Sequence, residues 1–202
     1  QNSKGRDGGG KNVITIQDIC SGHGLTGLLF VACNPPGRMP ETCTKAVLVD
    51  QFEPKSHAIL KDIISEICPW VSENISFESS TLEEHASRSA NEERRDGGEE
   101  SVPAGIQHTT IIISTHACGS LTDGVLKYAM DVEAASAAVM PCCYTGMDNG
   151  VPYGLRRMLG VGLSADVRRS FYLQDRGYLV DFAAIPRAIT PMNRIVVAER
   201  RR

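Results

Sequence analysis

The feature that most constrains the fold is a regular alternation along the chain. From Val13 onward, short runs of β-branched residues alternate with longer amphipathic stretches. This order is typical of a β-sheet whose strands are joined by crossover helices. Seven strands are expected, at Val13 to Ile19, Ala46 to Asp50, Ile75 to Glu78, Thr110 to Thr115, Ala137 to Met140, Leu179 to Ile185 and Arg194 to Ala198. Four helices are expected, at Leu25 to Ala32, Ser56 to Ile67, Leu121 to Val132 and Ala165 to Arg176.

The connection between the last two predicted strands differs from the others. It runs only from Pro186 to Pro191, which is too short for a crossover helix, so these two strands must pair antiparallel. Ser164 is placed to cap the last predicted helix and Gly177 to end it. The sequence therefore predicts an α/β fold with a seven-stranded, mostly parallel sheet that closes in a C-terminal antiparallel hairpin.

The chain is expected to form one domain. Its 202 residues are 42% hydrophobic, which is enough to bury a single core. Residues 1–11 are polar and glycine-rich and are expected to be a flexible tail, with the domain spanning 12–202. Residues 34–44 are expected to be a loop. Residues 81–105, rich in Glu, Arg, Ser and Gly, are expected to be a mobile insertion between the third and fourth strands.

Composition also bears on the compartment. No apolar run approaches the roughly 18 residues that a membrane-spanning helix needs, so no membrane partner is expected. The seven cysteines are odd in number and have no repeated spacing, and several lie in apolar stretches. Unpaired thiols in a reducing compartment are the expected state, and we predict a cytoplasmic protein.

A glycine-bearing turn follows the first predicted strand, in the segment Asp18-Ile-Cys-Ser-Gly-His-Gly24. Glycines at such a turn allow the backbone to approach a ligand closely, and the free amides at the start of the next helix favour electron-rich groups. Cys20 stands where the commoner G-x-G-x-G form has its first glycine. The turn alone therefore leaves several adenosine-containing cofactors open.

An acidic residue, Asp50, ends the second predicted strand. A carboxylate at this place can accept hydrogen bonds from both ribose hydroxyls of an adenosine cofactor. The alternative is that Asp50 only caps the turn that follows it.

Two further motifs follow the fourth and fifth strands. Thr115-His-Ala-Cys-Gly-Ser-Leu-Thr-Asp123 follows the fourth, and Met140-Pro-Cys-Cys-Tyr144 follows the fifth. Ligands of open α/β sheets bind at the carboxyl edge, near the point where the strand order reverses. We therefore expect both motifs to face the cofactor and the substrate.

These two motifs, the glycine turn, Asp50 and the ending Ile185-Pro-Arg-Ala-Ile-Thr-Pro-Met-Asn193 resemble a family of Rossmann-like class I methyltransferases. That family includes the tRNA 2'-O-methyltransferases of the Trm-thirteen type. The chain departs from those enzymes in having Tyr144, where they have His, after the paired cysteines. The resemblance implies S-adenosyl-L-methionine as cofactor, with Asp50 on the ribose and Glu78 to Leu82 near the adenine. The expected cofactor-binding residues are Asp18, Cys20, Gly22, Gly24, Asp50 and His116.

Methyl transfer requires mainly that a nucleophile be aligned behind the methyl group and lose a proton where necessary. His116 is the expected general base, although a histidine that only holds its loop fits the sequence equally well. Tyr144 is expected to orient or stack on a planar target and is the second candidate catalytic residue. The expected substrate-binding residues are Cys142, Cys143, Tyr144, Arg156 and Arg157.

The cysteines and the histidine of these motifs are also potential zinc ligands. Adjacent cysteines seldom chelate one ion with good tetrahedral geometry, so no metal is expected, and inert thiols are favoured over a covalent role for Cys143.

Charge is distributed unevenly between the two ends of the chain. Residues 151–202 carry ten arginines against four acidic residues, a balance of +6 in a chain of net charge −3. A basic end can attract phosphate, although solvated arginines on helix surfaces would give the same pattern. We therefore predict methylation of RNA, with tRNA as a candidate. The alternatives are a small-molecule or protein acceptor, or a cofactor-binding module without catalysis.

Overall fold

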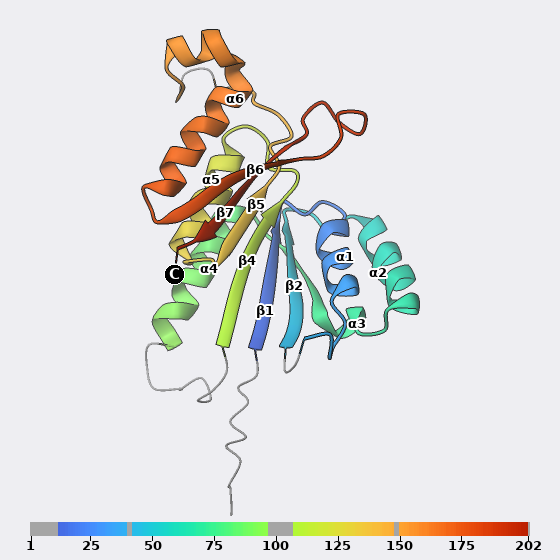
Figure 1. The fold of residues 1–202 in the computed structure, drawn as a ribbon. Coiled ribbons are helices and arrows are strands. Elements are labelled where there is room, and N and C mark those ends of the chain that lie inside the picture. Colours follow the sequence, from blue (N-terminus) through green and yellow to red (C-terminus); the bar gives the residue numbers. More distant parts are fainter. Residues whose placement is uncertain (1–11, 40–41, 97–106, 148–149, 202) are drawn as a thin grey trace, which may run out of the picture.

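The computed structural model describes residues 12–39, 42–96, 107–147 and 150–201, with the side chains of 92–96 excluded. The expected N-terminal tail, residues 1–11, lies outside the described residues. The described part is a seven-stranded sheet between two layers of helices (Figure 1). Its strands are β1 (Asn12–Ile19), β2 (Thr42–Asp50), β3 (Ile75–Ser79), β4 (Gln107–Ser114), β5 (Ser136–Val139), β6 (Tyr178–Ala184) and β7 (Arg194–Arg200).

The strand order is β3-β2-β1-β4-β5-β7-β6. The first five strands pair in parallel, and β7 pairs antiparallel with both β5 and β6. The predicted mixed sheet and its C-terminal hairpin are therefore confirmed. The chain order reverses between β1 and β4, which are neighbours in the sheet. Their carboxyl ends, with those of β2 and β5, meet at one end of the molecule, and this end is where open α/β sheets bind ligands.

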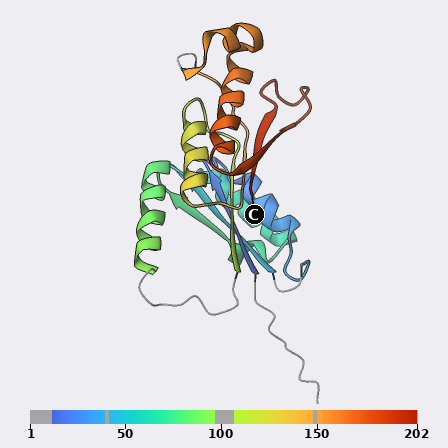
Figure 2. The same ribbon diagram turned by 60° about the vertical axis from the view of Figure 1, so that its left-hand side comes forward.

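Helices cover both faces of the sheet (Figure 2). One face carries α1 (Leu25–Cys33), α2 (Lys55–Ile67) and α3 (Val71–Asn74), and the other carries α4 (Leu82–Asp96), α5 (Leu121–Asp131) and α6 (Tyr153–Gln174). The strands supply both cores by alternation. In β4, Ile111 and Ile113 pack with the first group of helices, whereas Ile112 packs with the second. In the described part of the chain, no helix is both long and apolar enough to cross a membrane.

The predicted insertion at 81–105 is wrong over its first part, because residues 82–96 form α4. The helix begins in a capping box. Glu84 Oε2 accepts a hydrogen bond from the Thr81 amide (2.9 Å), and Thr81 Oγ1 accepts one from the Glu84 amide (3.2 Å). α4 supplies the crossover between the parallel strands β3 and β4. The remaining residues, 97–105, lie outside the described residues, and β4 begins at Gln107.

The last helix is longer than predicted. α6 begins at Tyr153 rather than at Ala165, and Gly160 interrupts it with φ 75° and ψ 166°, a conformation open essentially to glycine. The predicted cap, Ser164, is instead buried inside the helix, where its hydroxyl donates to the Gly160 carbonyl (2.7 Å). The segment before Gly160 stands above the carboxyl edge of the sheet (Figure 1). Gly177, at φ 86°, follows the end of the helix as predicted.

Candidate cofactor and acceptor site

The glycine turn joins β1 to α1 at the carboxyl edge. Cys20, Gly22 and Gly24 all have positive φ, at 57°, 54° and 75°. Glycine adopts positive φ without steric cost, which explains its presence at positions 22 and 24. In Cys20, which has a Cβ, the same positive φ is strained, and strain of this kind is found at functional sites. Gly24 is also needed for packing, because a Cβ there would lie 2.4 Å from Leu48 Cδ1. Gly24 therefore shapes the turn from behind, while a Cβ on Gly22 would face His116 Cδ2 at 3.8 Å.

Asp18 lies buried beneath this turn, with 1% of its surface exposed. Its Oδ2 accepts a hydrogen bond from the Gly27 amide (3.1 Å), and its Oδ1 has no partner among the described residues. Burial raises the pKa of the Asp18 carboxyl to about 7, the Gly27 amide opposes this rise, and the nearby charge of Asp50 adds to it. A buried carboxyl group with an oxygen that accepts no hydrogen bond lowers the stability of the fold. Such groups are typical of ligand-binding sites.

A cleft with a volume of about 280 Å³ opens over the ends of β1, β2 and β4. Three of the predicted cofactor residues, Cys20, Asp50 and His116, line it together. The Asp50 carboxylate is fixed by the Gly22 amide, which donates to Oδ2 (2.9 Å). The pKa of the Cys20 thiol is raised to about 11. Burial is the main cause, and the negative charges of Asp50, Asp18 and Glu83 add to it. Cys20 is therefore a protonated, unreactive part of the wall rather than a nucleophile.

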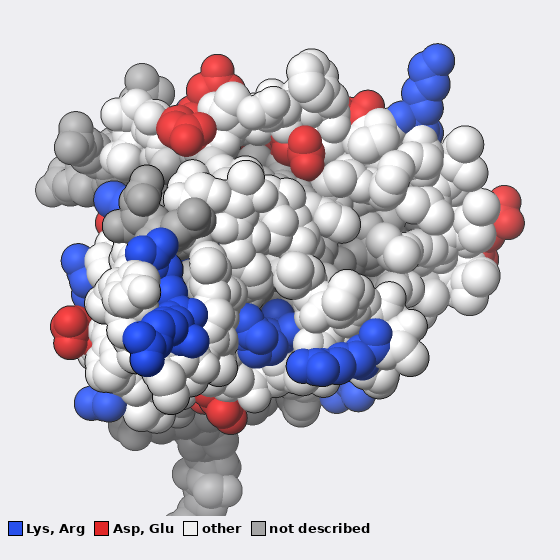
Figure 3. Space-filling view, turned by 90° about the horizontal axis from the view of Figure 1, so that it is seen from above, with Lys and Arg blue, Asp and Glu red and all other residues white. Residues whose placement is uncertain are grey.

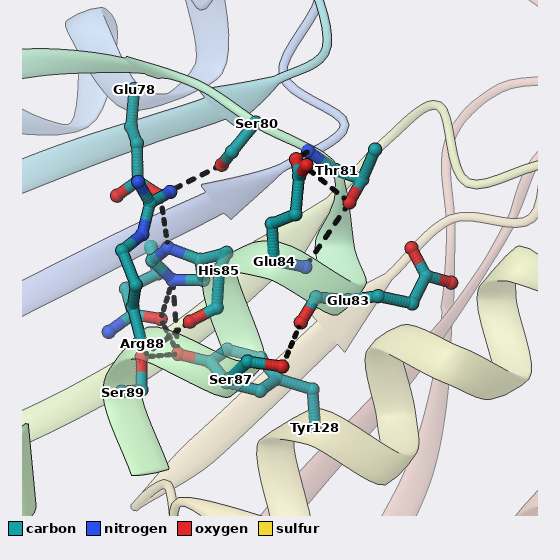
Figure 4. A network of polar contacts seen from close by, with 11 residues as sticks. Glu78, Ser80, Thr81, Glu83, Glu84, His85, Ser87, Arg88, Ser89 and Tyr128 are labelled. Atoms are coloured by element: carbon teal, nitrogen blue, oxygen red, sulfur yellow. Dashed lines mark hydrogen bonds and ion pairs between the residues drawn. The ribbon is translucent and has the colours of Figure 1, made fainter. Parts of the chain in front are cut away.

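The far wall of the cleft comes from the turn between β3 and α4. Ser80, Thr81 and Leu82 line the cleft, as the predicted adenine stretch requires. Glu78 does not, because it turns toward α4 (Figure 4). There it accepts hydrogen bonds from Ser80 Oγ (2.8 Å) and His85 Nδ1 (2.9 Å). Burial alone would raise the pKa of Glu78, but these bonds and the charges of His85 and Arg88 hold it below its usual value.

His85 connects this wall to the sheet. The side chain is buried, and its Nε2 lies 3.0 Å from the Tyr128 hydroxyl on α5 and 3.2 Å from Gln17 Oε1 on β1. The Tyr128 hydroxyl also donates to Gln17 Oε1 (2.7 Å). The network in Figure 4 thus holds the start of α4, and with it the Ser80 turn, at a fixed place beside the cleft. Sequence reasoning missed it because its members are far apart in the chain.

The His116 to Asp123 motif divides into two parts in the structure. His116 is exposed and lines the cleft, so its side chain is available to a ligand. Thr122 and Asp123 are structural. The buried Thr122 hydroxyl donates to the Ala117 carbonyl (2.6 Å), and Asp123 pairs with Arg168 and Arg169 of α6, both at 2.7 Å. The motif therefore presents His116 and anchors α6.

The second motif takes part in the same anchor. Arg169, 2% exposed, also pairs with the fully buried Asp166 (3.0 Å), whose other oxygen accepts from the Tyr144 hydroxyl (2.6 Å) and from Arg194 of β7 (2.9 Å). The Tyr144 ring lies near the guanidinium groups of Arg169 and Arg194, 5.7 and 5.8 Å from its centroid. The sequence suggested Arg169 as part of a basic, RNA-attracting surface, but the side chain is buried in these ion pairs. The only sequence signal for the ion pairs was an acidic residue within an arginine-rich helix.

Tyr144 is consequently held inside the molecule by its hydroxyl. Burial, together with the hydrogen bond to Asp166 and its charge, raises the pKa of Tyr144 to about 12, so the phenol stays protonated near neutral pH. A phenol in this state is a poor proton acceptor. The structure thus brings Tyr144 to the edge of the sheet as predicted, and it places the side chain between α6 and β7.

The cysteines of the two motifs lie next to each other. Cys118 and Cys142 are joined as a disulfide with their Cα atoms 5.5 Å apart, so the expectation of unpaired thiols is wrong for this pair. Cys143 is free. Hydrogen bonds from the backbone and side chain of Thr145 lower the pKa of the Cys143 thiol.

The predicted substrate residues Arg156 and Arg157 lie on the part of α6 that precedes Gly160. Seen from the carboxyl edge, Lys and Arg side chains gather along one side of the molecule (Figure 3). No described residue forms an ion pair with Arg156, Arg157 or Arg187, and the buried Nε of Arg156 has no described partner. The structure therefore places unpaired positive charge at the end of the molecule that carries the cleft.

The parallel sheet, its C-terminal hairpin and a cleft at the switch point define a Rossmann-like fold of the class I methyltransferase type. Residues 45–150 match the family Methyltransf_32, described as a methyltransferase domain. The chain belongs to this family and is an S-adenosyl-L-methionine-dependent methyltransferase.

Several solved structures are similar to this chain at low sequence identity. A protein from Corynebacterium glutamicum has 12% identity and a TM-score of 0.50, with 98% of this chain and 76% of that one covered. A protein from Clostridium thermocellum, described as a candidate rRNA-methylase, has 10% identity and a TM-score of 0.50, with 98% and 96% covered. A 16S rRNA adenine methyltransferase from Catenulisporales acidiphilia, solved with its cosubstrate SAM, has 16% identity and a TM-score of 0.47, with 94% and 84% covered. No curated protein matches the chain by sequence.

Proposed function

We propose that this methyltransferase acts on RNA, with tRNA as the first candidate acceptor. The observation that carries the proposal is the unpaired positive charge at the end of the molecule that carries the cleft. Arg156, Arg157 and Arg187 have no acidic partner among the described residues, and the chain around them is far more basic than the rest. Unpaired arginines at this end of the molecule suit a phosphate backbone, whose oxygens accept their hydrogen bonds. The resemblance of the two motifs to tRNA methyltransferases points to the same substrate class.

The residues around the cleft fit S-adenosyl-L-methionine. Asp50 is held by the Gly22 amide through one oxygen, and no described residue bonds its other oxygen, which suits it to a ribose hydroxyl. The unpartnered Asp18 Oδ1 and Ser21 Oγ lie beneath the glycine turn, where the cationic methionine end would sit. Ser80, Thr81 and Leu82 would form the adenine side. When bound, the cofactor supplies an electrophilic methyl group on a sulfonium sulfur.

His116 is the residue in the cleft best suited to move a proton. It is exposed on the loop after β4, and its ring faces Gly22. We infer that it accepts the proton of the acceptor hydroxyl or amine while the methyl group is transferred. Tyr144 takes the role of a positioning residue, because its hydroxyl ties Asp166 to the loop that follows β5. The arginines of α6 and of the hairpin connection would orient the acceptor.

Two measurements test the proposal separately. The first is incubation of the protein with methyl-labelled cofactor and either total RNA or RNA-free protein extract, and we expect label in the RNA fraction. The second is filter binding of RNA at increasing salt, where affinity should fall steeply because bound phosphates release counterions. Retention should drop in Arg156→Gln/Arg157→Gln. The matched control Arg38→Gln changes an exposed arginine between α1 and β2, at the opposite edge of the sheet, and should bind normally. Absence of RNA retention at low salt, or label only in protein, would contradict an RNA acceptor.

A further inference from the structure

A cluster of three thiols lies at the carboxyl edge, outside the cofactor cleft. Cys118 comes from the loop after β4, and Cys142 and Cys143 come from the loop after β5. Their three sulfur atoms all lie within 4.8 Å of one another, and no other cysteine, histidine or carboxylate group of the described residues converges in this way. Residues 24 positions apart in the chain are thus brought together by the pairing of β4 with β5.

Core packing does not account for this cluster. Cys118 is exposed, and Cys142 and Cys143 are only half-buried. None of the three packs in the hydrophobic cores, whereas Cys20 and Cys68 do. Thiols that are accessible and mutually close can react with each other or bind soft cations, and neither use is available to inert core cysteines.

The backbone around the thiols is fixed in place. The Gly119 amide donates to the Cys143 carbonyl (3.3 Å), and the Leu121 amide donates to the Cys118 carbonyl (3.0 Å). Gly119 lies so close to the second loop that a Cβ would be 2.8 Å from the Thr145 carbonyl oxygen. The two loops are therefore preorganised, and little ordering is needed to bring three thiolates around one ion.

We propose that the reduced thiols of Cys118, Cys142 and Cys143 form a binding site for a soft divalent cation, with Zn²⁺ as the natural occupant. Zinc–thiolate bonds of about 2.3 Å place sulfurs roughly 3.8 Å apart in a tetrahedron, and the three sulfurs of the cluster lie within 4.8 Å of one another. Adjacent cysteines are an uncommon ligand pair, but here a third thiol from another strand completes a three-sulfur face. His116 does not join the three thiols among the described residues, so the fourth ligand would be water.

The disulfide and the metal site exclude each other. The Cys118–Cys142 bond must first be reduced, for example by a water-soluble phosphine. The phosphine gives two electrons to the S–S bond and takes up the oxygen of one water, whose two protons end on the two sulfurs. Three thiols then lose one proton each as the divalent ion binds, so binding should become tighter as pH rises. The site is independent of the RNA substrate proposed above.

The test uses the full chain, reduced with phosphine and titrated with Co²⁺ as a spectroscopic probe. We expect one Co²⁺ per chain, an intense thiolate-to-cobalt charge-transfer band, and loss of that band when Zn²⁺ is added. Zinc should also protect three thiols from a thiol reagent. Cys143→Ser and Cys118→Ser should each reduce the Co²⁺ affinity at least about tenfold. The matched control, Cys33→Ser, changes an exposed cysteine outside the cluster and should bind as the parent does.

Three results would overturn the proposal. They are a titration without a charge-transfer band, a band that persists unchanged in Cys143→Ser, and a band lost equally in Cys33→Ser. Circular dichroism of each reduced variant, before the ion is added, shows whether the fold is intact. Should Cys118→Ser be misfolded, Cys143→Ser decides the question, because Cys143 is not part of the disulfide.

Discussion

Replacing Asp18 by Asn should stabilise the cofactor-free protein at alkaline pH and leave its stability unchanged in acid. In the folded protein burial raises the pKa of Asp18 from 3.8 to about 7. Below pH 3.8 the carboxyl is protonated in both states, and above pH 7 it is ionised in both, but ionisation in the folded state costs desolvation. The stability associated with the neutral acid is therefore complete below the unfolded pKa and is lost as pH rises toward 7.

The size of the effect follows from the same pKa. One pKa unit corresponds to about 1.4 kcal/mol, so the ionised Asp18 lowers the free energy of unfolding by up to about 4 kcal/mol at pH 8. Asn has the same shape, stays neutral, and its carbonyl oxygen can still accept from the Gly27 amide. The free energy of unfolding of Asp18→Asn should thus be higher than that of the parent by up to about 4 kcal/mol at about pH 8. At about pH 4 the difference should be less than about 1 kcal/mol.

Urea unfolding at several pH values, followed by fluorescence of the single tryptophan, Trp70, measures this difference. Trp70 reports on the fold because its Nε1 donates to the Val31 carbonyl (3.0 Å). The control is Asp62→Asn, which changes an exposed carboxyl on α2. Its free energy of unfolding should vary with pH as that of the parent does. If the free energy of unfolding of Asp18→Asn also varies with pH as that of the parent does, burial does not keep the Asp18 carboxyl neutral, and the raised pKa is refuted.

The same variant separates function from structure. Calorimetry should show weaker binding of S-adenosyl-L-methionine to Asp18→Asn, because the cationic methionine end loses a carboxylate partner. Greater stability together with weaker binding is the signature of an acid retained for its ligand, at the expense of the fold. Tighter cofactor binding to Asp18→Asn would refute its assignment to the cofactor site.

Three other predictions concern the cleft and its anchor. Asp50→Ala should raise the dissociation constant of the cofactor about 10- to 100-fold in calorimetry, whereas His116→Ala should mainly lower turnover, about 10²-fold or more. If His116→Ala weakened cofactor binding more than Asp50→Ala does, the roles assigned to His116 and Asp50 would be wrong. Arg169→Met should lower the free energy of unfolding by about 3 to 5 kcal/mol in urea, because Asp166 then loses a buried partner. Tyr144→Phe should cost only about 1 to 2 kcal/mol, since Arg194 still pairs with Asp166. A collapse of methyl transfer in Tyr144→Phe without loss of stability would restore Tyr144 as a catalytic residue.

The cofactor side of the site could be predicted because its residues mark the ends of strands. β-branched runs identify strands, and parallel strands put their carboxyl ends at one edge, so Cys20, Asp50 and His116 had to converge. The short link before β7 likewise left antiparallel pairing as the only solution. The chain needs no long-range information for these conclusions, since periodicity and connection length are local.

The sequence by itself thus determined the class of fold, the glycine turn and the carboxyl-edge cleft. Tertiary structure alone decided what depends on partners distant in the chain. α4 is a polar segment whose helix is fixed by its capping box and by the contact of His85 with Gln17, 68 residues away. Tyr144 was expected to contact the substrate, but its hydroxyl is hydrogen-bonded to Asp166. The cysteine cluster forms because β4 pairs with β5. Burial decides the state of such side chains, and burial is a property of the packed structure, which local periodicity does not specify.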